Sequence, residues 1–129
     1  MSRLLLDTHA LLWWLFDSPQ LGKSTRKLIA SRGNEVFVSS VSLWEVALKQ
    51  RSGKLSGVLD YLADHRSVHA EAGLRELTIT HGHAVVAGAL DWPHRDPFDR
   101  MLVSQSRIEQ LELVTQDERI RAFHPSCRW

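Results

Sequence analysis

The amino-acid sequence predicts an α/β fold in which helices cover both faces of a mostly parallel central sheet. Short apolar runs that end in polar residues, at 4–6, 36–39 and 111–115, are typical of buried parallel strands. Segments with apolar residues at helical spacing separate these runs along the whole chain. Strands connected through helices in this way run parallel, so their carboxyl ends meet at one edge of the sheet, where ligands bind in such folds.

Each expected element is bounded by residues with a known local preference. Asp17, Ser18 and Pro19 stop the first helix, and Gly33 with Asn34 stops the second. In chain order, the sequence predicts strands over residues 4–6, 36–39, 74–79 and 111–115 with a short fifth strand near the C-terminus, and helices over residues 10–16, 23–31, 42–50, 58–64, 81–90 and from 96 through 108.

Size and composition predict a single domain over residues 1–129. The apolar fraction of 43% and the charged fraction of 24% are those of a globular protein in water. No apolar run approaches the ~20 residues that cross a bilayer, no secretory signal is indicated, and Cys127 has no second cysteine to pair with. We therefore expect a cytoplasmic protein. The net charge of +1 does not by itself indicate binding to nucleic acid.

Two acids near the first two strands have both a structural and a functional interpretation. Asp7 follows the first strand and could simply cap the next helix. Glu45 could complete a capping box opened by Ser42. If Ser39 or Ser40 caps that helix instead, Glu45 would face the strand ends. The sequence leaves these alternatives open.

Asp99 and Asp117, in the C-terminal half, have the same double interpretation. Asp96 and Pro97 read as the cap and first residue of a helix, with Asp99 as a first-turn acid. Asp117 follows the fourth strand, where a cap or turn role is the default. All four acids, Asp7, Glu45, Asp99 and Asp117, can nevertheless lie at the same end of the sheet.

Carboxylates brought together in this way favour a cation. Two carboxylates ~4 Å apart repel by several kcal/mol at a protein surface, so a cluster either takes up protons or binds metal. Hard oxygen ligands suit Mg²⁺ or Mn²⁺, and metal held by acids can assist the hydrolysis of a phosphodiester. The residues alone therefore predict an acidic metal site.

Other sites are less well supported by the sequence. The seven histidines match no zinc motif and are expected mostly at helix ends and on solvated surface, and no phosphate-binding glycine loop or Gly-x-Ser-x-Gly elbow occurs. Trp13, Trp14 and Trp44 are interpreted as core or dimer contacts. A phosphotransfer protein would need a lysine where Asp117 and its neighbours stand, and a dehalogenase-type phosphatase would need Asp-x-Asp at Asp7.

Four blocks of the sequence resemble PIN-domain proteins of the VapC toxin type in their order and spacing. The blocks are LLLDTHALLWW at 4–14, VSSVSLWEVALK at 38–49, RDPFDRML at 95–102 and LVTQD at 113–117. This resemblance implies a three-layer α/β/α sandwich with a parallel sheet of about five strands. It also implies an endoribonuclease that uses Mg²⁺ or Mn²⁺ and acts as the toxin of a toxin–antitoxin pair.

The resemblance assigns the metal ligands to the four acids. Asp7, Glu45 and Asp99 would hold a first metal, and Asp117 with Asp7 a second. Asp96 belongs to the third block and is a further candidate ligand, although its capping role is sufficient to explain it.

Contacts to substrate and partners are expected around these acids. The candidates for binding RNA are Thr8, Thr115, Lys49, Arg95 and Arg100. The resemblance further implies a small antitoxin protein that covers the site, and a homodimer with contacts on the early helices. The alternatives are a binding module that keeps the fold without catalysis, which the intact acidic set argues against, and a phosphotransfer or phosphatase enzyme on a similar sheet.

Overall fold

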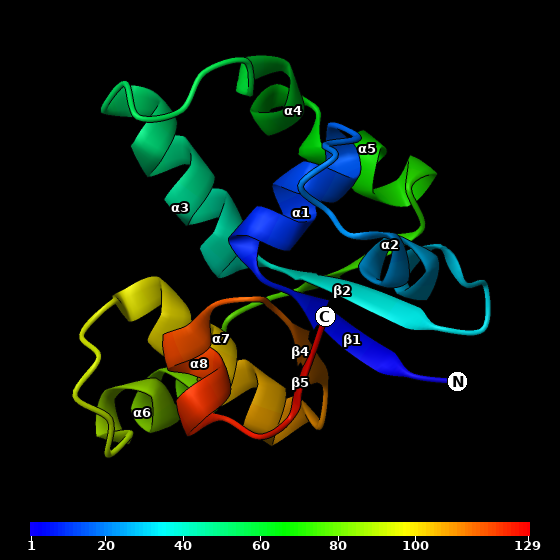
Figure 1. Cartoon of the computed structure of the whole chain (residues 1–129). Coiled ribbons are helices and arrows are strands. Elements are labelled where there is room, and N and C mark those ends of the chain that lie inside the picture. Colours follow the sequence, from blue (N-terminus) through cyan, green and yellow to red (C-terminus); the bar gives the residue numbers. More distant parts are fainter.

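A parallel sheet of five strands runs through the middle of the protein in the computed structural model, which describes residues 1–129 (Figure 1). The strand order is β3-β2-β1-β4-β5, and every neighbouring pair is parallel. The expected sheet of about five strands is therefore confirmed. The strands are β1 (Arg3–Leu6), β2 (Glu35–Ser39), β3 (Leu74–Leu77), β4 (Glu112–Val114) and β5 (Cys127–Arg128).

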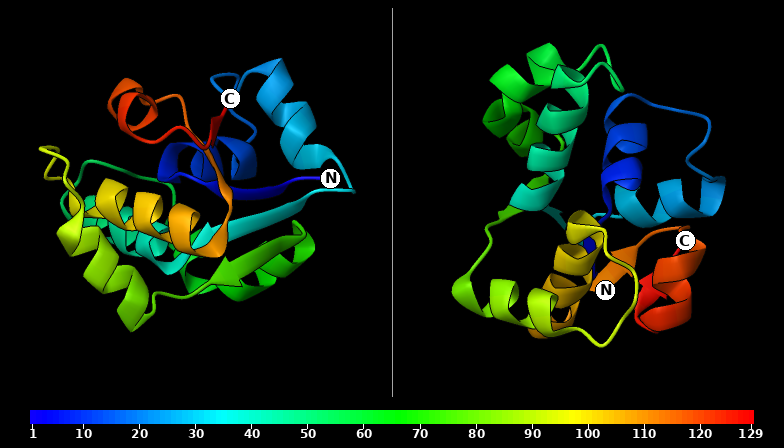
Figure 2. Two further views of the ribbon diagram at one scale, coloured as in Figure 1. Left: turned by 90° about the horizontal axis from the view of Figure 1, so that it is seen from below. Right: turned by 90° about the vertical axis from the view of Figure 1, so that its left-hand side faces the viewer.

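Helices cover both faces of the sheet and complete three layers. The four helices α1, α2, α4 and α5 lie on one side, and α6, α7 and α8 lie on the other (Figure 1). Helices α6 and α7 lie side by side (Figure 2). The helices are α1 (Thr8–Leu15), α2 (Lys23–Ala30), α3 (Ser40–Arg51), α4 (Leu59–Ala63), α5 (His65–Glu71), α6 (His81–Ala89), α7 (Pro97–Glu109) and α8 (Glu118–Phe123). None of them is both long and apolar enough to span a membrane.

The central strand β1 is buried on both faces, which explains its unbroken leucine run. Leu4 and Leu6 belong to the apolar cluster beneath α1 and α2, whereas Leu5 belongs to the cluster beneath α7 and α8. All three side chains are fully buried. Because side chains alternate between the faces of a strand, a strand with two covered faces needs apolar residues at every position.

The order of the strands reverses at β1. The chain proceeds from β1 to β2 and β3 on one side, then crosses to β4 and β5 on the other. Leu6 is the register partner of Val114, so the residues that follow β1 and β4 leave the sheet next to each other. Ligand sites in open parallel sheets form at such a reversal, beyond the carboxyl ends of the strands.

Several boundaries differ from the expected ones. The helix expected over 42–50 begins at Ser40, because Ser39 caps it, and the strand expected over 74–79 ends at Leu77. The segment around 58–64 forms α4 and is followed directly by a separate helix, α5, which the sequence analysis did not anticipate. Helix α8 was also missed, because its six residues are too few for a helical period to stand out.

Candidate functional site

Asp7 follows β1 at the carboxyl edge of the sheet, next to the end of β4. Its backbone amide donates a hydrogen bond to the carbonyl of Val114 at 3.1 Å, which continues the β1–β4 pairing by one residue. Its Oδ1 accepts a hydrogen bond from the Ala10 amide at 2.7 Å, so the helix-cap interpretation is confirmed. Burial raises the pKa of Asp7, hydrogen bonds from Thr115 and Ala10 oppose this, and the charge of Glu45 adds to it.

Glu45 lies in the second turn of α3 rather than in a capping box. Ser39 caps the helix, and its hydroxyl accepts a hydrogen bond from the Val41 amide at 3.0 Å. The alternative in which Glu45 approaches the strand ends therefore holds. Glu45 is only 7% exposed, its charge acts on Asp7, and its Oε2 lies 2.6 Å from the Lys49 ammonium.

Asp96 and Asp99 occupy the start of α7. Oδ1 of Asp96 accepts hydrogen bonds from the amides of Phe98 and Asp99 at 2.8 and 3.2 Å, which confirms its capping role. Oδ2 of Asp99 lies 2.7 Å from Nε2 of His94. Burial raises the pKa of Asp99 to about 6, the charges of Asp96 and Asp117 add to the rise, and the hydrogen bond with His94 opposes it.

Asp117 caps α8 and also faces the other acids. Its Oδ1 accepts hydrogen bonds from the amides of Arg119 and Ile120 at 2.9 and 3.1 Å. Its own amide donates to the hydroxyl of Thr115 at 3.1 Å. Thr115 therefore contacts both Asp7 and Asp117, and links the acids that follow β1 and β4.

The acids gather at one edge of the sheet but do not share a single set of contacting oxygens. Asp7 and Glu45 act on each other electrostatically, as do Asp99 and Asp117. The compact group is formed by His94, Asp96 and Asp99, whose candidate ligand atoms all lie within 4.8 Å of one another, and the other three acids lie outside it.

The donor set fits a hard divalent cation. It consists mainly of carboxylate oxygens, and the pKa values of Asp7 and Asp99 are raised because burial and neighbouring negative charge oppose ionisation. A bound Mg²⁺ or Mn²⁺ would relieve this repulsion.

His94 is the member of this region that sequence reasoning missed. It lies in the loop before α7, and its side chain is largely buried. The signal in the sequence that could have identified His94 is its position two residues before Asp96. More generally, the expectation that histidines occupy helix ends and solvated surface was only partly right. His83 does occupy the capping box of α6, but His69, His83 and His124 are all buried.

The expected substrate-binding residues differ in burial and in whether their polar groups already have partners within the protein. Thr8 is buried and donates to the Ser42 hydroxyl at 3.0 Å, and Thr115 is buried against Asp7, so both support the acids from within. Lys49 is half-buried and paired with Glu45. Arg95 is exposed.

Arg100 requires a correction, because its guanidinium is fully engaged with backbone carbonyls. Nε and both Nη atoms donate to five carbonyl oxygens at the end of α6 and in the segment that connects α6 to α7, at 2.7 to 3.4 Å. The acceptors are Ala87, Gly88, Leu90, Trp92 and His94. Arg100 therefore holds this segment in place and has no donor left for an RNA backbone.

Comparison with known proteins agrees with this architecture. The family model described as PIN domain matches residues 4–124. The chain belongs to the PIN-domain family. This PIN domain is similar to Ribonuclease VapC22 of Mycobacterium tuberculosis, with 28% identity over 97% of this chain and 95% of the relative.

Solved structures share the fold of this PIN domain. A toxin–antitoxin complex from Klebsiella pneumoniae matches with a TM-score of 0.68 and 20% identity, over 98% of this chain and 96% of that chain. VapBC2 from Rickettsia felis, crystallised with a DNA fragment from its promoter, matches with a TM-score of 0.69 and 16% identity over 97% and 95%. At these identities the likeness establishes the three-layer fold.

The contacts of Arg100 predict a structural role that can be measured. Arg100→Lys and Arg100→Ala should both lower the free energy of unfolding by about 2–4 kcal/mol, since charged hydrogen bonds to mostly part-buried carbonyls are lost and a lysine cannot reach several of them. Urea unfolding of the two variants and of Arg95→Ala, an exposed control, would test this. Unchanged stability of Arg100→Lys would contradict the structural role.

The raised pKa of Asp99 predicts that the metal-free PIN domain loses stability as the pH rises. The protonated form of Asp99 is favoured in the folded protein. The favourable contribution of this carboxyl group to stability is therefore fully present below pH 3.8 and is lost as the pH rises through about 6. In EDTA, Asp99→Asn should therefore be more stable than the parent by on the order of 2 kcal/mol at pH 8, and equal to it near pH 4. Asp91→Asn, at an exposed carboxylate, is the control, and a difference independent of pH would refute this account.

Proposed function

We propose that this PIN domain is a metal-dependent endoribonuclease that acts as the toxin of a toxin–antitoxin pair. The observation that carries the proposal is the gathering of Asp7, Glu45, Asp99 and Asp117 at the carboxyl edge of the sheet, where burial raises the pKa values of Asp7 and Asp99 and the charges of Glu45 and Asp117 add to these rises. The similarity to Ribonuclease VapC22 over nearly the whole chain supports RNA as the substrate.

The four acids would hold Mg²⁺ or Mn²⁺, with Asp7, Glu45 and Asp99 at the principal position and Asp117 at a second. Such an ion, when bound, readies a water for attack on phosphorus and neutralises negative charge on the phosphodiester. Asp96 remains a candidate ligand through Oδ2, since Oδ1 is used in capping.

Neighbouring side chains would hold the acids in position. His94 fixes the Asp99 carboxylate through its 2.7 Å contact, and Thr115 joins Asp7 to the start of α8. Lys49 neutralises Glu45 at 2.6 Å and can turn toward a phosphate when a metal takes over that task. These contacts orient oxygens before substrate arrives, which lowers the cost of assembling the site.

RNA would approach along a hollow beside Asp7 and Glu45. A cavity of about 290 Å³ there is lined by Thr8, His9, Lys49 and Lys54, among others. Two lysines next to a carboxylate centre suit a polyanion, whose phosphates need cations along the strand. Arg95, exposed beside the start of α7, is the further candidate for gripping the backbone.

An antitoxin would dock on an apolar groove next to the acids. The groove has a volume of about 200 Å³ and lies between α3, α6 and α7, and Val41, Trp44, Ile79 and Met101 line it. Trp44 is 57% exposed although it packs edge-on against Phe98. An aromatic side chain left half in water at a groove is a typical anchor for a partner.

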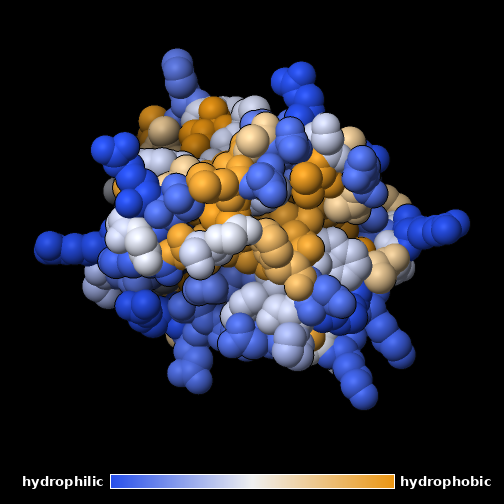
Figure 3. All heavy atoms as spheres, turned by 90° about the horizontal axis from the view of Figure 1, so that it is seen from above, coloured by the Kyte–Doolittle hydropathy of each residue, from blue (hydrophilic) through white to orange (hydrophobic).

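A homodimer is also part of the proposal, and we place its contacts outside the tryptophans of α1. Trp13 and Trp14 pack against the core, and Trp13 also contacts Trp129. The face formed by α1, α3, α4 and α5 carries a central apolar patch bordered by polar groups (Figure 3). Leu48 in α3, Leu59 in α4 and Phe16 directly after α1 are exposed and are better candidates for a subunit contact.

Cleavage of RNA tests the proposed activity. Purified protein, freed of any partner, should cut a structured RNA pool in Mg²⁺ or Mn²⁺ but not in EDTA. Asp99→Asn should lower the rate at least about 100-fold, the scale of removing one charge-stabilising group from an active site. Asp91→Asn should retain full activity. Absence of both metal binding and RNA cleavage would instead favour the non-catalytic binding module.

Trp44 tests the proposed antitoxin surface separately. Trp44→Ser should weaken binding of the small protein encoded alongside by roughly 30-fold or more, since a buried tryptophan anchor is worth about 2 kcal/mol or more. RNA cleavage by the free variant should be unchanged. The control is Val85→Ser, an exposed apolar residue of α6 outside the groove. Equal affinity of both variants would place the antitoxin elsewhere.

A further inference from the structure

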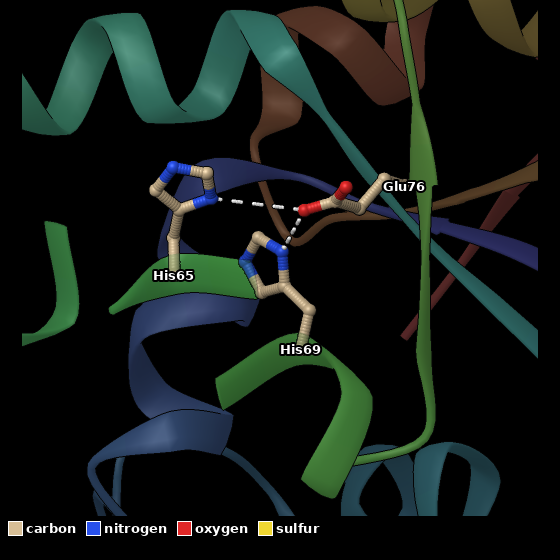
Figure 4. A group of neighbouring side chains, drawn as sticks. All are labelled: His65, His69 and Glu76. Carbon is tan, nitrogen blue, oxygen red and sulfur yellow. Dashed lines mark hydrogen bonds and ion pairs between the residues drawn. The ribbon is translucent and has the colours of Figure 1, made fainter. Parts of the chain in front are cut away.

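A second group of possible metal ligands lies away from the acids, between α5 and the edge strand β3. His65 and His69 come from α5, and Glu76 comes from β3 (Figure 4). Both imidazole rings point toward the same carboxylate oxygen. Nδ1 of His69 lies 2.8 Å from Oε2 of Glu76, and Nδ1 of His65 lies 3.7 Å from it.

The local sequence brings these three residues together. His65 and His69 are four residues apart, so their side chains project from the same face of α5. Gly73 then adopts a left-handed backbone conformation with a φ of 69°, which L-residues with a side chain rarely accept. This turn reverses the chain directly after α5 and lays β3 beside the helix, so that Glu76 faces the two rings.

His69 has the surroundings of a histidine that ligates a metal. It is buried, and its Nε2 lies 2.6 Å from the hydroxyl of Tyr61, which is also buried. A ligating histidine is normally held by a hydrogen bond from its other ring nitrogen. The tyrosine hydroxyl can accept that proton, because a hydroxyl both donates and accepts. Nδ1 is then free to use its lone pair on a cation.

His65 supplies a buried nitrogen that no other protein group satisfies. Its Nδ1 is shielded from solvent and has no hydrogen-bond partner. It is directed at an oxygen that already bonds to His69, from a distance too long for a hydrogen bond. Ligand atoms of a tetrahedral zinc ion lie about 3.3 Å apart, because its bonds to nitrogen and oxygen are ~2.0–2.2 Å long. The two distances of 2.8 and 3.7 Å bracket that value.

Space for a further ligand lies next to the three side chains. A cavity of about 140 Å³ is lined by His65, His69 and Glu76, and by Ser40 and Thr78 among others. This volume accommodates an ion together with a water molecule. None of the acids at the β1–β4 edge lines it.

We propose that His65, His69 and Glu76 form a zinc site, separate from the acidic cluster, with a water from the cavity as the fourth ligand. Two imidazoles and one carboxylate with an open fourth position are a known zinc donor set, and imidazole selects Zn²⁺ over Mg²⁺. The bound ion clamps α5 to the edge strand β3. The site is independent of the proposed ribonuclease activity, since it shares no residue with it.

Zinc binding by the whole chain tests the site. Calorimetric titration with Zn²⁺ is done in excess Mg²⁺ and in an Asp99→Asn background, so that the acidic cluster does not contribute. We expect one equivalent to bind and to raise the melting temperature. His65→Ala should weaken the affinity at least about 100-fold, beyond the 10- to 100-fold cost of an outer contact. Tyr61→Phe, which removes such an outer contact, should weaken the zinc affinity by about 10- to 100-fold.

The variants separate a metal site from a hydrogen-bonded cluster. His65 makes no hydrogen bond through Nδ1, so His65→Ala should fold normally and keep its melting temperature in EDTA. His81→Ala, an exposed histidine at the start of α6, should bind Zn²⁺ like the parent. Substitution of Co²⁺ should give the strong visible absorption of a tetrahedral site, absent in His65→Ala. Absence of zinc binding to the parent, or equal affinity of the His65 and His81 variants, would overturn the proposal.

Discussion

The parallel arrangement of the strands is the constraint on which the rest of the structure depends. It places the carboxyl ends of all strands at the same edge of the sheet. Because β1 and β4 are adjacent, the residues that follow these two strands are neighbours. Acids at these positions meet whether or not the fold gains from it. Burial raises the pKa values of Asp7 and Asp99, and neighbouring negative charge adds to both rises, so that ionising these acids costs stability that the buried leucine strand and its two covered faces must outweigh.

Helix capping and ligand geometry use the same side chains here. Asp7, Asp96 and Asp117 each accept backbone hydrogen bonds through Oδ1, at the starts of α1, α7 and α8. The capping bonds fix each carboxylate against a rigid helix and leave its second oxygen for other contacts. The structural and functional interpretations of these acids are thus compatible, and the helix starts orient the oxygens in advance.

The fold could be read from the sequence because its signals are local. The run from Leu4 to Leu6 and the Asp96-Pro97 helix start each depend on neighbouring residues, and both were predicted correctly. The start of α3 was ambiguous, because Ser39 and Ser42 are both good caps and only the end of β2 decides between them.

Contacts between distant segments could not be derived in the same way. Arg100 was expected to bind RNA, yet it binds carbonyls up to 13 residues away, and only the folded path of the α6–α7 segment brings them within reach. His94 became visible as a partner of Asp99 only once its loop was placed. The spacing of His65 and His69 places both on one face of α5, but Glu76 could not be joined to them from the sequence, because the turn at Gly73 brings it to the two rings.

The two outer strands have a consequence for how copies of this chain can associate. An outer strand with free backbone groups is a template on which another chain can add a strand and begin to aggregate. Here β5 has only two residues, and β3 has four and exposes Arg75 and Glu76. Short and charged borders of this kind resist growth of the sheet from one molecule to the next. Assembly is thereby directed to the helical surfaces, which can close into a complex of defined size.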